Sequence, residues 1–164
     1  MNVPEYLFAD ADAIGIKLEI VNGLATWEAS PVVLHQNRAD RIRQSFRSTQ
    51  PGTYGCGCFH YPDIDIRFPD GSRKRPDISV YCMELVEEAR IVTQIPDAVI
   101  EIISKGYEAK DREIGIPFYI SQKIRDIVLL DPYTNEVLHY VDGVKNVLQS
   151  PVAVTMQCGC VCLV

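Results

Sequence analysis

The sequence predicts an α+β or α/β domain, built on a mixed β-sheet with flanking helices. Two apolar runs, at residues 97–103 and 126–131, are separated by a segment with helical features, and a hairpin signal lies near the N-terminus. A strand, a crossover helix and a second strand favour parallel pairing of the two apolar runs. The remaining predicted strands are compatible with antiparallel neighbours.

The composition fits one domain without a membrane span. The chain has 164 residues, of which 47% are hydrophobic and 23% charged. That length suffices for one core and is too short for two ordinary domains, so we treat residues 1–164 as one unit. No run approaches the roughly 18 apolar residues of a membrane helix, and the acidic N-terminus does not resemble a signal peptide. We therefore expect a cytoplasmic protein that does not bind membranes.

The net charge of −6 argues against a strong nonspecific nucleic-acid binder, which would carry an excess of Lys and Arg. It does not exclude a nuclease, because carboxylates that hold a metal ion are themselves acidic.

The N-terminal part is predicted to form a hairpin and then a helix. Residues 17–29 alternate on both sides of Asn22-Gly23, a dipeptide that readily takes the positive φ angles of a two-residue turn. Residues 30–48 have apolar side chains at helical spacing, with Ser30 as candidate N-cap and Pro31 at the first helical position. The other side of this helix carries Arg38, Arg41, Arg43 and Arg47.

The middle of the chain is predicted to form an antiparallel meander. Residues 63–68, "DIDIRF", alternate strictly, and the turn "PDGSRKR" leads to a strand at 76–82. Residues 83–95 are ambiguous between a short helix and a loop. The basic residues of the turn and of the preceding helix either form a solvated face or contact phosphates beside a metal site; those of the turn are Arg73, Lys74 and Arg75.

The C-terminal part begins with residues 97–103, which are too apolar for an edge strand and are predicted to be central in the sheet. Residues 107–124 are helical in pattern but contain Gly115 and Pro117, so we expect a kink or two short helices. A buried strand at 126–131 follows, and a final hairpin turns at Asp142-Gly143.

Two carboxylates lie at the edges of β-branched runs. Asp77 opens one predicted strand, and Glu101 lies inside the central one, where an unpaired carboxylate would cost several kcal/mol. Acids from adjacent strands can converge on one Mg²⁺, which uses only one or two protein carboxylates. Such an ion lowers the pKa of a bound water and stabilises charge on a phosphate. Alternatively, Asp77 caps a turn and Glu101 pairs with Lys105 or an arginine.

An ordered set of segments carries a family resemblance: "LEIVNGLATWEASPVVLHQNRADRI", "KRPDISVYC", "PDAVIEIIS", the next helix with Tyr119, and "IVLLDPYTNEVLHYVDG". Together they resemble the bacterial Uma-two family of the PD-(D/E)XK superfamily over about residues 17–148. The resemblance implies a restriction endonuclease-like core and a Mg²⁺- or Mn²⁺-dependent endonuclease that hydrolyses phosphodiester bonds in DNA. It also implies that Asp77 and Glu101 hold the metal together with the backbone carbonyl of Ile102.

The superfamily lysine is missing from both places where the resemblance would put it. Two residues after the second acid the chain has Ile103. Uma-two proteins commonly have a serine one residue later, which matches Ser104, and a lysine on the next helix, at a position that is Gly115 here.

Two other lysines are candidates for this role. Lys105 would share the face of Glu101 if the strand continued. Lys110 lies in the first turn of the next helix, from which its long side chain could reach back. We favour Lys110, because Gly106 is expected to end the strand and turn Lys105 outward; alternatively, both are solvated. Asp111 is expected to stabilise the helix N-terminus, with a lysine partner as the alternative.

The N-terminal helix of this superfamily often brings a further polar residue to the metal. Candidates here are His35 and Gln36, with Glu19 on the preceding hairpin. A histidine at a helix start is more often a structural hydrogen-bonding residue than a ligand.

The cysteines form two runs of period two, "CGC" at 56–58 and "CGCVC" at 158–162. Four thiolates from neighbouring strands could hold zinc. However, structural zinc sites usually have ligands about two to four residues apart, and a one-residue spacing on an extended strand spreads the sulfurs unless the backbone bends. Zinc is therefore not favoured, and we expect buried, reduced thiols that act as small hydrophobic groups.

Two functions follow from these observations. The retained acids favour a Mg²⁺-dependent nuclease acting on DNA. The missing lysines at positions 103 and 115 favour a catalytically impaired nuclease-fold protein that binds nucleic acid or protein. Cutting two strands needs two sites, so a homodimer is expected by analogy.

Overall fold

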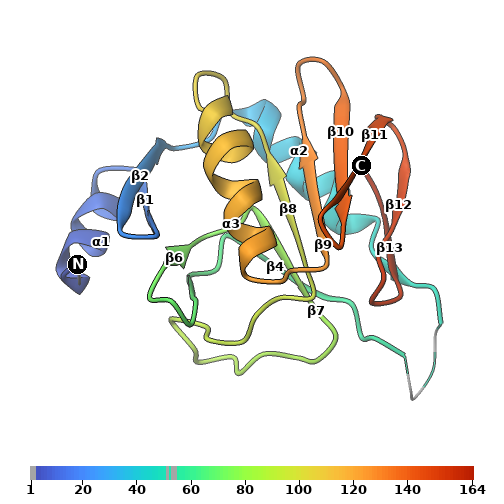
Figure 1. The fold of residues 1–164 in the computed structure, drawn as a ribbon, viewed down its shortest axis with the longest axis horizontal. Helices are drawn as coiled ribbons and strands as arrows, with labels where there is room; N and C mark the ends of the chain where they lie inside the picture. The colour runs from blue at the N-terminus through green and yellow to red at the C-terminus, as the bar shows by residue number, and fades with distance from the viewer. Residues whose placement is uncertain (1–2, 51, 53–54) are drawn as a thin grey trace.

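A six-stranded mixed sheet lies at the centre of the structure (Figure 1). The computed structural model describes residues 3–50, 52 and 55–164. In spatial order the central strands are β11 (Val144–Gln149), β10 (Glu136–Val141), β9 (Asp126–Leu130), β8 (Ala98–Ile102), β7 (Ile78–Tyr81) and β4 (Phe59–Pro62). β8 and β9 pair in parallel and the other neighbours are antiparallel, so the predicted parallel pair and mixed sheet are confirmed.

Two smaller sheets flank the central one. One has the order β2-β1-β6-β5, with β2 (Leu24–Ala29), β1 (Ile16–Val21), β6 (Arg73–Lys74) and β5 (Ile66–Arg67). The other has the order β12-β13-β3, with β12 (Ala153–Thr155), β13 (Cys160–Leu163) and β3 (Arg47–Ser48).

The helices are α1 (Glu5–Ala13), α2 (Val33–Gln44), a π-helical turn η1 (Lys110–Gly115) and α3 (Ile116–Ser121). The change from η1 to α3, with Pro117 in the first turn of α3, confirms the predicted interruption. None of the helices in the described part of the chain has the length and apolarity that a membrane-spanning helix requires.

β8 separates two hydrophobic cores because its side chains alternate between the faces of the sheet. Ile100 and Ile102 pack in the core with Ile42 of α2 and with residues of β12 and β13. Val99 packs on the opposite side with α3 and the four-stranded sheet. Glu101 has the parity of Val99, so its carboxylate points into the side that α3 covers.

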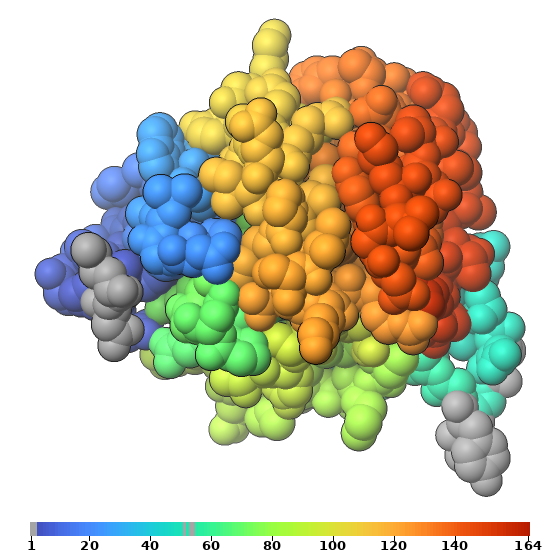
Figure 2. All heavy atoms as spheres, in the orientation of Figure 1, coloured from blue at the N-terminus to red at the C-terminus, as the bar shows by residue number. Residues whose placement is uncertain are grey.

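Both predicted hairpins are confirmed. Asn22 and Gly23 have φ angles of 51° and 79°, and Asp142 and Gly143 have 47° and 80°. On the first hairpin, the ring of Trp27 lies edge-on to that of Tyr107, with centroids 5.9 Å apart. Figure 2 shows this hairpin in contact with the helical segment that follows β8.

Three local predictions need correction. α2 begins at Val33 with Val32 as its N-cap, while the Ser30 hydroxyl donates to the carbonyl of Gly15 instead. The strand predicted at 63–68 contracts to β5, because its ladder with β6 has only two residue pairs. The meander is split: β5 pairs with β6, whereas β7 pairs with β4 and β8. Residues 83–95 are a loop with one isolated bridge at Val92.

Candidate active site

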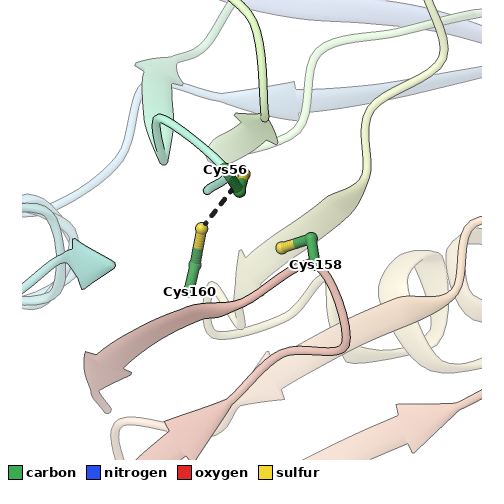
Figure 3. Close-up of side chains that lie close together, drawn as sticks. All are labelled: Cys56, Cys158 and Cys160. Carbon is green, nitrogen blue, oxygen red and sulfur yellow. Dashed lines mark hydrogen bonds between the residues drawn. The ribbon is translucent and has the colours of Figure 1, made fainter. Parts of the chain in front are cut away.

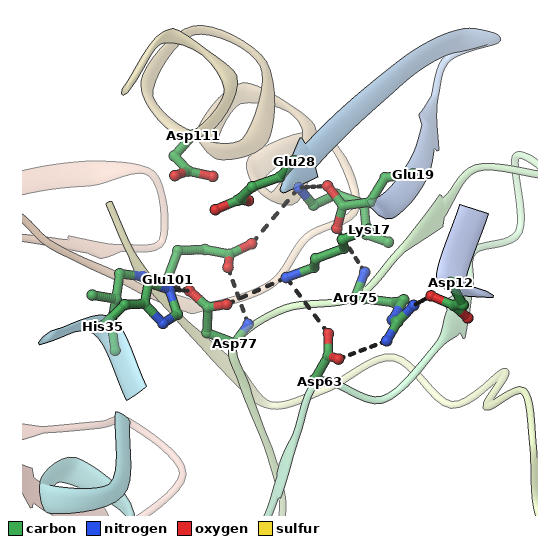
Figure 4. Close-up of polar contacts among 12 residues, drawn as sticks. Asp12, Lys17, Glu19, Glu28, His35, Asp63, Arg75, Asp77, Glu101 and Asp111 are labelled. Carbon is green, nitrogen blue, oxygen red and sulfur yellow. Dashed lines mark hydrogen bonds and ion pairs between the residues drawn. The ribbon is translucent and has the colours of Figure 1, made fainter. Parts of the chain in front are cut away.

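Asp77 and Glu101 meet where β7 begins beside β8 (Figure 4). The Asp77 N–H donates to Oε2 of Glu101 at 3.1 Å, and the Ile102 N–H donates to Oδ2 of Asp77 at 2.8 Å. The N–H and C=O of one strand residue point to the same edge, so the Ile102 carbonyl points to the edge of β8 on which Asp77 lies, beyond the last ladder pair, Ile78 with Ile100. The three groups expected to hold a metal therefore lie together.

Lys17 and Lys74 place two ammonium groups against these acids. Nζ of Lys17 lies 3.3 Å from Oδ1 of Asp77. Nζ of Lys74 lies 3.0 Å from Oε2 of Glu19 and 3.7 Å from Oε1 of Glu101. These contacts join β1 and β6 of the small sheet to the start of β7 and the middle of β8.

The basic turn is not a solvated face. Lys74 has 1% exposure, and Arg73 has 8% and is bound by Asp65 and Glu5. Only Arg75 of this turn lies at the surface cavity, where Asp12 and Asp63 bind it. On α2 and β3, Arg41 and Arg47 are exposed, while Arg38 donates to Asn135 and Arg43 pairs with Asp40.

Lys110 is part of the site and Lys105 is outside it. Nζ of Lys110 lies 2.7 Å from Asp111, 3.1 Å from Glu28 and 3.8 Å from Glu19. β8 ends at Ile102 and the chain turns at Gly106, which leaves Lys105 exposed. Asp111 is 3% exposed and binds Lys110, the alternative expected for it. It also lies in the first turn of η1, as expected, but its side chain does not cap that helix.

Lys74 lies beside Gly115, the helix position that has no side chain. A Cβ atom added at Gly115 would be 3.6 Å from Nζ of Lys74, so the ammonium group occupies space next to the helix that a longer residue would enter. The same ammonium lies 5.1 Å from the centroid of the Tyr119 ring, and the Tyr119 hydroxyl donates to Oε1 of Glu101. The helical segment thus contributes the Tyr119 hydroxyl and, at Gly115, a position without a side chain. β6 contributes Lys74.

His35 and Gln36 reach the site from the first turn of α2. Nε2 of His35 lies 3.0 Å from Oδ2 of Asp77. Gln36 is exposed and lines a cavity of about 520 Å³ that opens beside Asp77. Other residues of the cavity wall are Asp12, Ile16, Lys17, Glu28, Asp40, Asp63 and Arg75. Glu101, Lys74 and Lys110 lie beneath this wall.

The charges of the cluster shift the pKa values of its acids in different directions. Burial alone would raise the pKa of Glu19, but Lys74, Lys110 and Lys17 outweigh it and lower that pKa to about 2. The pKa of Asp77 is also lowered, because Lys17 and the His35 hydrogen bond outweigh the effect of burial.

Glu101 differs from these two acids. Burial is the largest influence and raises its pKa to about 7, because Lys74 offsets the loss of hydration only in part and Asp77 adds a like charge. For Lys110, burial would lower the pKa, but the surrounding carboxylates, Glu19 first, raise it. The pKa of His35 is likewise raised, because the Asp77 carboxylate outweighs the effect of burial.

The residues present fit a divalent metal ion. Asp77, Glu101 and the Ile102 carbonyl offer oxygen ligands, which Mg²⁺ prefers. The five buried or half-buried carboxylates carry two more charges than the three lysine ammonium groups, and protonation of His35 reduces this excess to one. A divalent ion would offset this negative charge.

Sequence reasoning missed Lys17 and Glu28, and it named Lys74 only as a basic turn residue that is solvated or contacts phosphate, without placing it beside Glu101. The first two had a signal: Lys17 and Glu19 alternate onto one face of β1, and the hairpin register places Glu28 opposite Lys17. Lys74 had no such signal, because only the folded path of the chain brings β6 beneath Glu101.

A mixed sheet covered by helices on both faces, with two acids at adjacent strands, defines a restriction endonuclease-like fold. The chain belongs to the Uma2 family, described as "Putative restriction endonuclease", whose family profile matches residues 3–157. A crystal structure of a "putative nuclease belonging to DUF820" from Anabaena variabilis ATCC 29413 is similar, with a TM-score of 0.66 and 21% identity. The match covers 85% of this chain and 81% of that one. No curated protein matches the chain.

Proposed function

We propose that this protein is a Mg²⁺- or Mn²⁺-dependent endonuclease that hydrolyses phosphodiester bonds in DNA. The observation that carries the proposal is the pair Asp77 and Glu101, joined by a hydrogen bond from the Asp77 N–H to the Glu101 carboxylate, with Asp77 lining an open cavity. Membership of a nuclease family supports it.

Asp77, Glu101 and the Ile102 carbonyl would hold the ion. The bound ion would supply a water of lowered pKa and positive charge for the scissile phosphate. Lys17 lies on the cavity wall, where its ammonium can neutralise charge that develops on the phosphate. His35 fixes the orientation of Asp77 through its hydrogen bond.

Lys74 is proposed as a positioning residue in place of the absent helix lysine. Its burial keeps it from touching a substrate, but its ammonium favours the ionised form of Glu101. Lys110 contacts Glu19, Glu28 and Asp111, so we assign it to holding those acids. We thus assign the role expected for Lys110 to two other lysines. Lys17 neutralises charge on the phosphate, and Lys74 positions Glu101.

Plasmid nicking with Mg²⁺ or Mn²⁺ tests the function. Asp77→Ala and Glu101→Ala should each lower the cleavage rate at least about 100-fold. Each removes a ligand of the metal ion whose charge would stabilise the transition state. Glu113→Ala is the matched control, since it removes an exposed carboxylate of η1. Equal residual nicking in the wild type and in both ligand variants would contradict the proposal.

Lys74→Met tests the positioning role. Losing the ammonium should raise the pKa of Glu101 further, so the pH profile of cleavage should move to higher pH by about one unit or more. Adding Gly115→Lys to this variant should return part of the activity at neutral pH, because a lysine from the helix enters the vacated space. Lys105→Met is the control. A pH profile unchanged in Lys74→Met would remove Lys74 from the mechanism.

The binding-module alternative is favoured by one observation: the Lys17 ammonium pairs with Asp77 at 3.3 Å, on the carboxylate that would hold the metal. If that ion pair excludes the metal, the wild type will not nick DNA in Mg²⁺ or Mn²⁺. It will then bind a duplex equally well before and after Asp77→Ala, as measured by fluorescence anisotropy.

A further inference from the structure

Five of the six cysteines gather at the end of β7 opposite Asp77. Asp77 directly precedes β7 and Cys82 directly follows it, a separation of about 16 Å along an extended strand. The sulfurs of Cys56, Cys158 and Cys160 lie within 4.8 Å of one another, with Cys56 and Cys160 3.5 Å apart (Figure 3). This cluster is separate from the acidic site.

The cysteines are not all free thiols in the structure. Cys56 is bonded to Cys82 and Cys58 to Cys160, while Cys158 and Cys162 are free. The expectation of six reduced cysteines is therefore wrong for four of them. Disulfides and metal-bound thiolates are alternative states of the same sulfurs, so the pairing shows which sulfurs are within reach of one another.

Neither cysteine run is a straight extended strand, because the backbone bends in both. The first run lies outside any strand, and Cys58 has a φ of 50°. In the second, Gly159 has a φ of 93° and donates its N–H to the carbonyl of Met156, which closes a turn before β13. The bends aim Cys158 and Cys160 at Cys56, which the one-residue spacing alone would not allow.

The separations suit a tetrahedral ion. Zinc–sulfur bonds of about 2.3 Å place tetrahedral sulfurs about 3.8 Å apart, which small side-chain rotations would give here. The backbone N–H of Cys160 donates toward the Cys158 sulfur, a contact that favours the thiolate, although burial raises the pKa of this thiol overall. A divalent ion supplies the positive charge that offsets this burial.

We propose that the reduced protein holds one structural Zn²⁺ through Cys56, Cys82, Cys158 and Cys160. Cys82 is chosen over Cys58 because the Cys58 sulfur faces the carbonyl oxygens of Cys56 and Gly159, which would repel a thiolate. The ion ties the C-terminal turn to the end of β7. Cys56 and Cys82 lie within the residues 3–157 that the family profile matches, and Cys158 and Cys160 lie beyond them.

Metal analysis of full-length protein tests this site. The protein is expressed with added Zn²⁺, purified under a phosphine reductant and gel-filtered, and we expect about one zinc per chain. Cys158→Ala should lose the zinc although it leaves both disulfide pairs available. Cys162→Ala should keep it, as a matched cysteine that lies outside the cluster. Asp77→Ala should also keep it, which separates this site from the acidic one.

The proposal would be overturned if the reduced wild-type protein contained no zinc, or if Cys158→Ala retained it. Circular dichroism and thermal melting of each variant show whether it is folded. Replacement of zinc by Co²⁺ adds a direct readout, because thiolate-to-cobalt charge-transfer absorption should appear in the wild type and in Cys162→Ala and be missing in folded Cys158→Ala. Loss of zinc from Cys58→Ala but not from Cys82→Ala would overturn the choice of Cys82.

Discussion

Glu101 has 3% exposure in the middle of β8, and its carboxylate accepts hydrogen bonds from the Tyr119 hydroxyl and the Asp77 N–H, with Lys74 close by. Burial nevertheless raises its pKa to about 7, from 4.5 in an exposed setting. Between these two pH values the folded chain binds more protons than the unfolded chain. The metal-free protein therefore loses stability as the pH rises from about 4.5 to 7.

Glu101→Gln should remove this loss, because the amide carries no charge to bury. In EDTA at pH 8 we expect the free energy of unfolding to exceed that of the wild type by about 1–3 kcal/mol, and the gain to vanish near pH 4.5. Urea denaturation at both pH values measures it. An equal difference at both pH values would show that Glu101 does not titrate in this range.

At the scale of the element, the β1–β2 hairpin presents Lys17, Glu19 and Glu28 to the site from one face. Its turn depends on Gly23, which has a φ of 79° and no heavy atom within 4 Å of an added Cβ. A substitution there acts through backbone strain alone. The geometry of three charged groups therefore rests on one turn.

Gly23→Val should cost about 1–3 kcal/mol of stability, because a β-branched residue is strained at this φ. It should also weaken Mg²⁺ binding, measured by calorimetry, because the register of the hairpin loosens. Gly143→Val is the matched control: Gly143 has a φ of 80° in a hairpin that carries none of these groups. A similar loss of stability with unchanged Mg²⁺ affinity is expected there. Equal weakening in both variants would mean that general destabilisation is the cause.

The elements that sequence could predict are those set by local chemistry. Asn22-Gly23 and Asp142-Gly143 define their hairpins, and the two apolar runs with a helix between them define the parallel pair. The two-residue strands β3 and β6 were missed because long-range pairing holds them in place, with little contribution from their own sequence. Asp77 and Glu101 could be found from the sequence because each lies in a segment with a clear local pattern. The position of Lys74 beside Glu101 could not, because it depends on the pairing of β6.

At the scale of the whole molecule, the negative charge of the chain continues into the cavity. Five acidic residues line its wall against two permanently positive ones; the acids are Asp12, Glu28, Asp40, Asp63 and Asp77, and the cations are Lys17 and Arg75. A polyanion approaching this wall is repelled unless divalent ions are bound. The proposed DNA binding should therefore depend on the metal.

We expect affinity for a phosphorothioate duplex, which resists hydrolysis, to rise at least about tenfold on replacing EDTA with Mg²⁺ at constant ionic strength. Fluorescence anisotropy measures it. Raising the NaCl concentration in EDTA is the control and should weaken binding, because monovalent salt only screens phosphate contacts. Equal affinity in EDTA and in Mg²⁺ would place the DNA on another surface.

The contact between Trp27 and Tyr107 gives the molecule an internal optical reporter. Trp27 is the only tryptophan of the chain, it precedes Glu28, and its ring rests against the entrance to the helical segment that carries Lys110. Its emission spectrum should change whenever the hairpin and that segment move apart. Without any added label, the chain can thus signal whether the two walls of its acidic site are closed around a ligand.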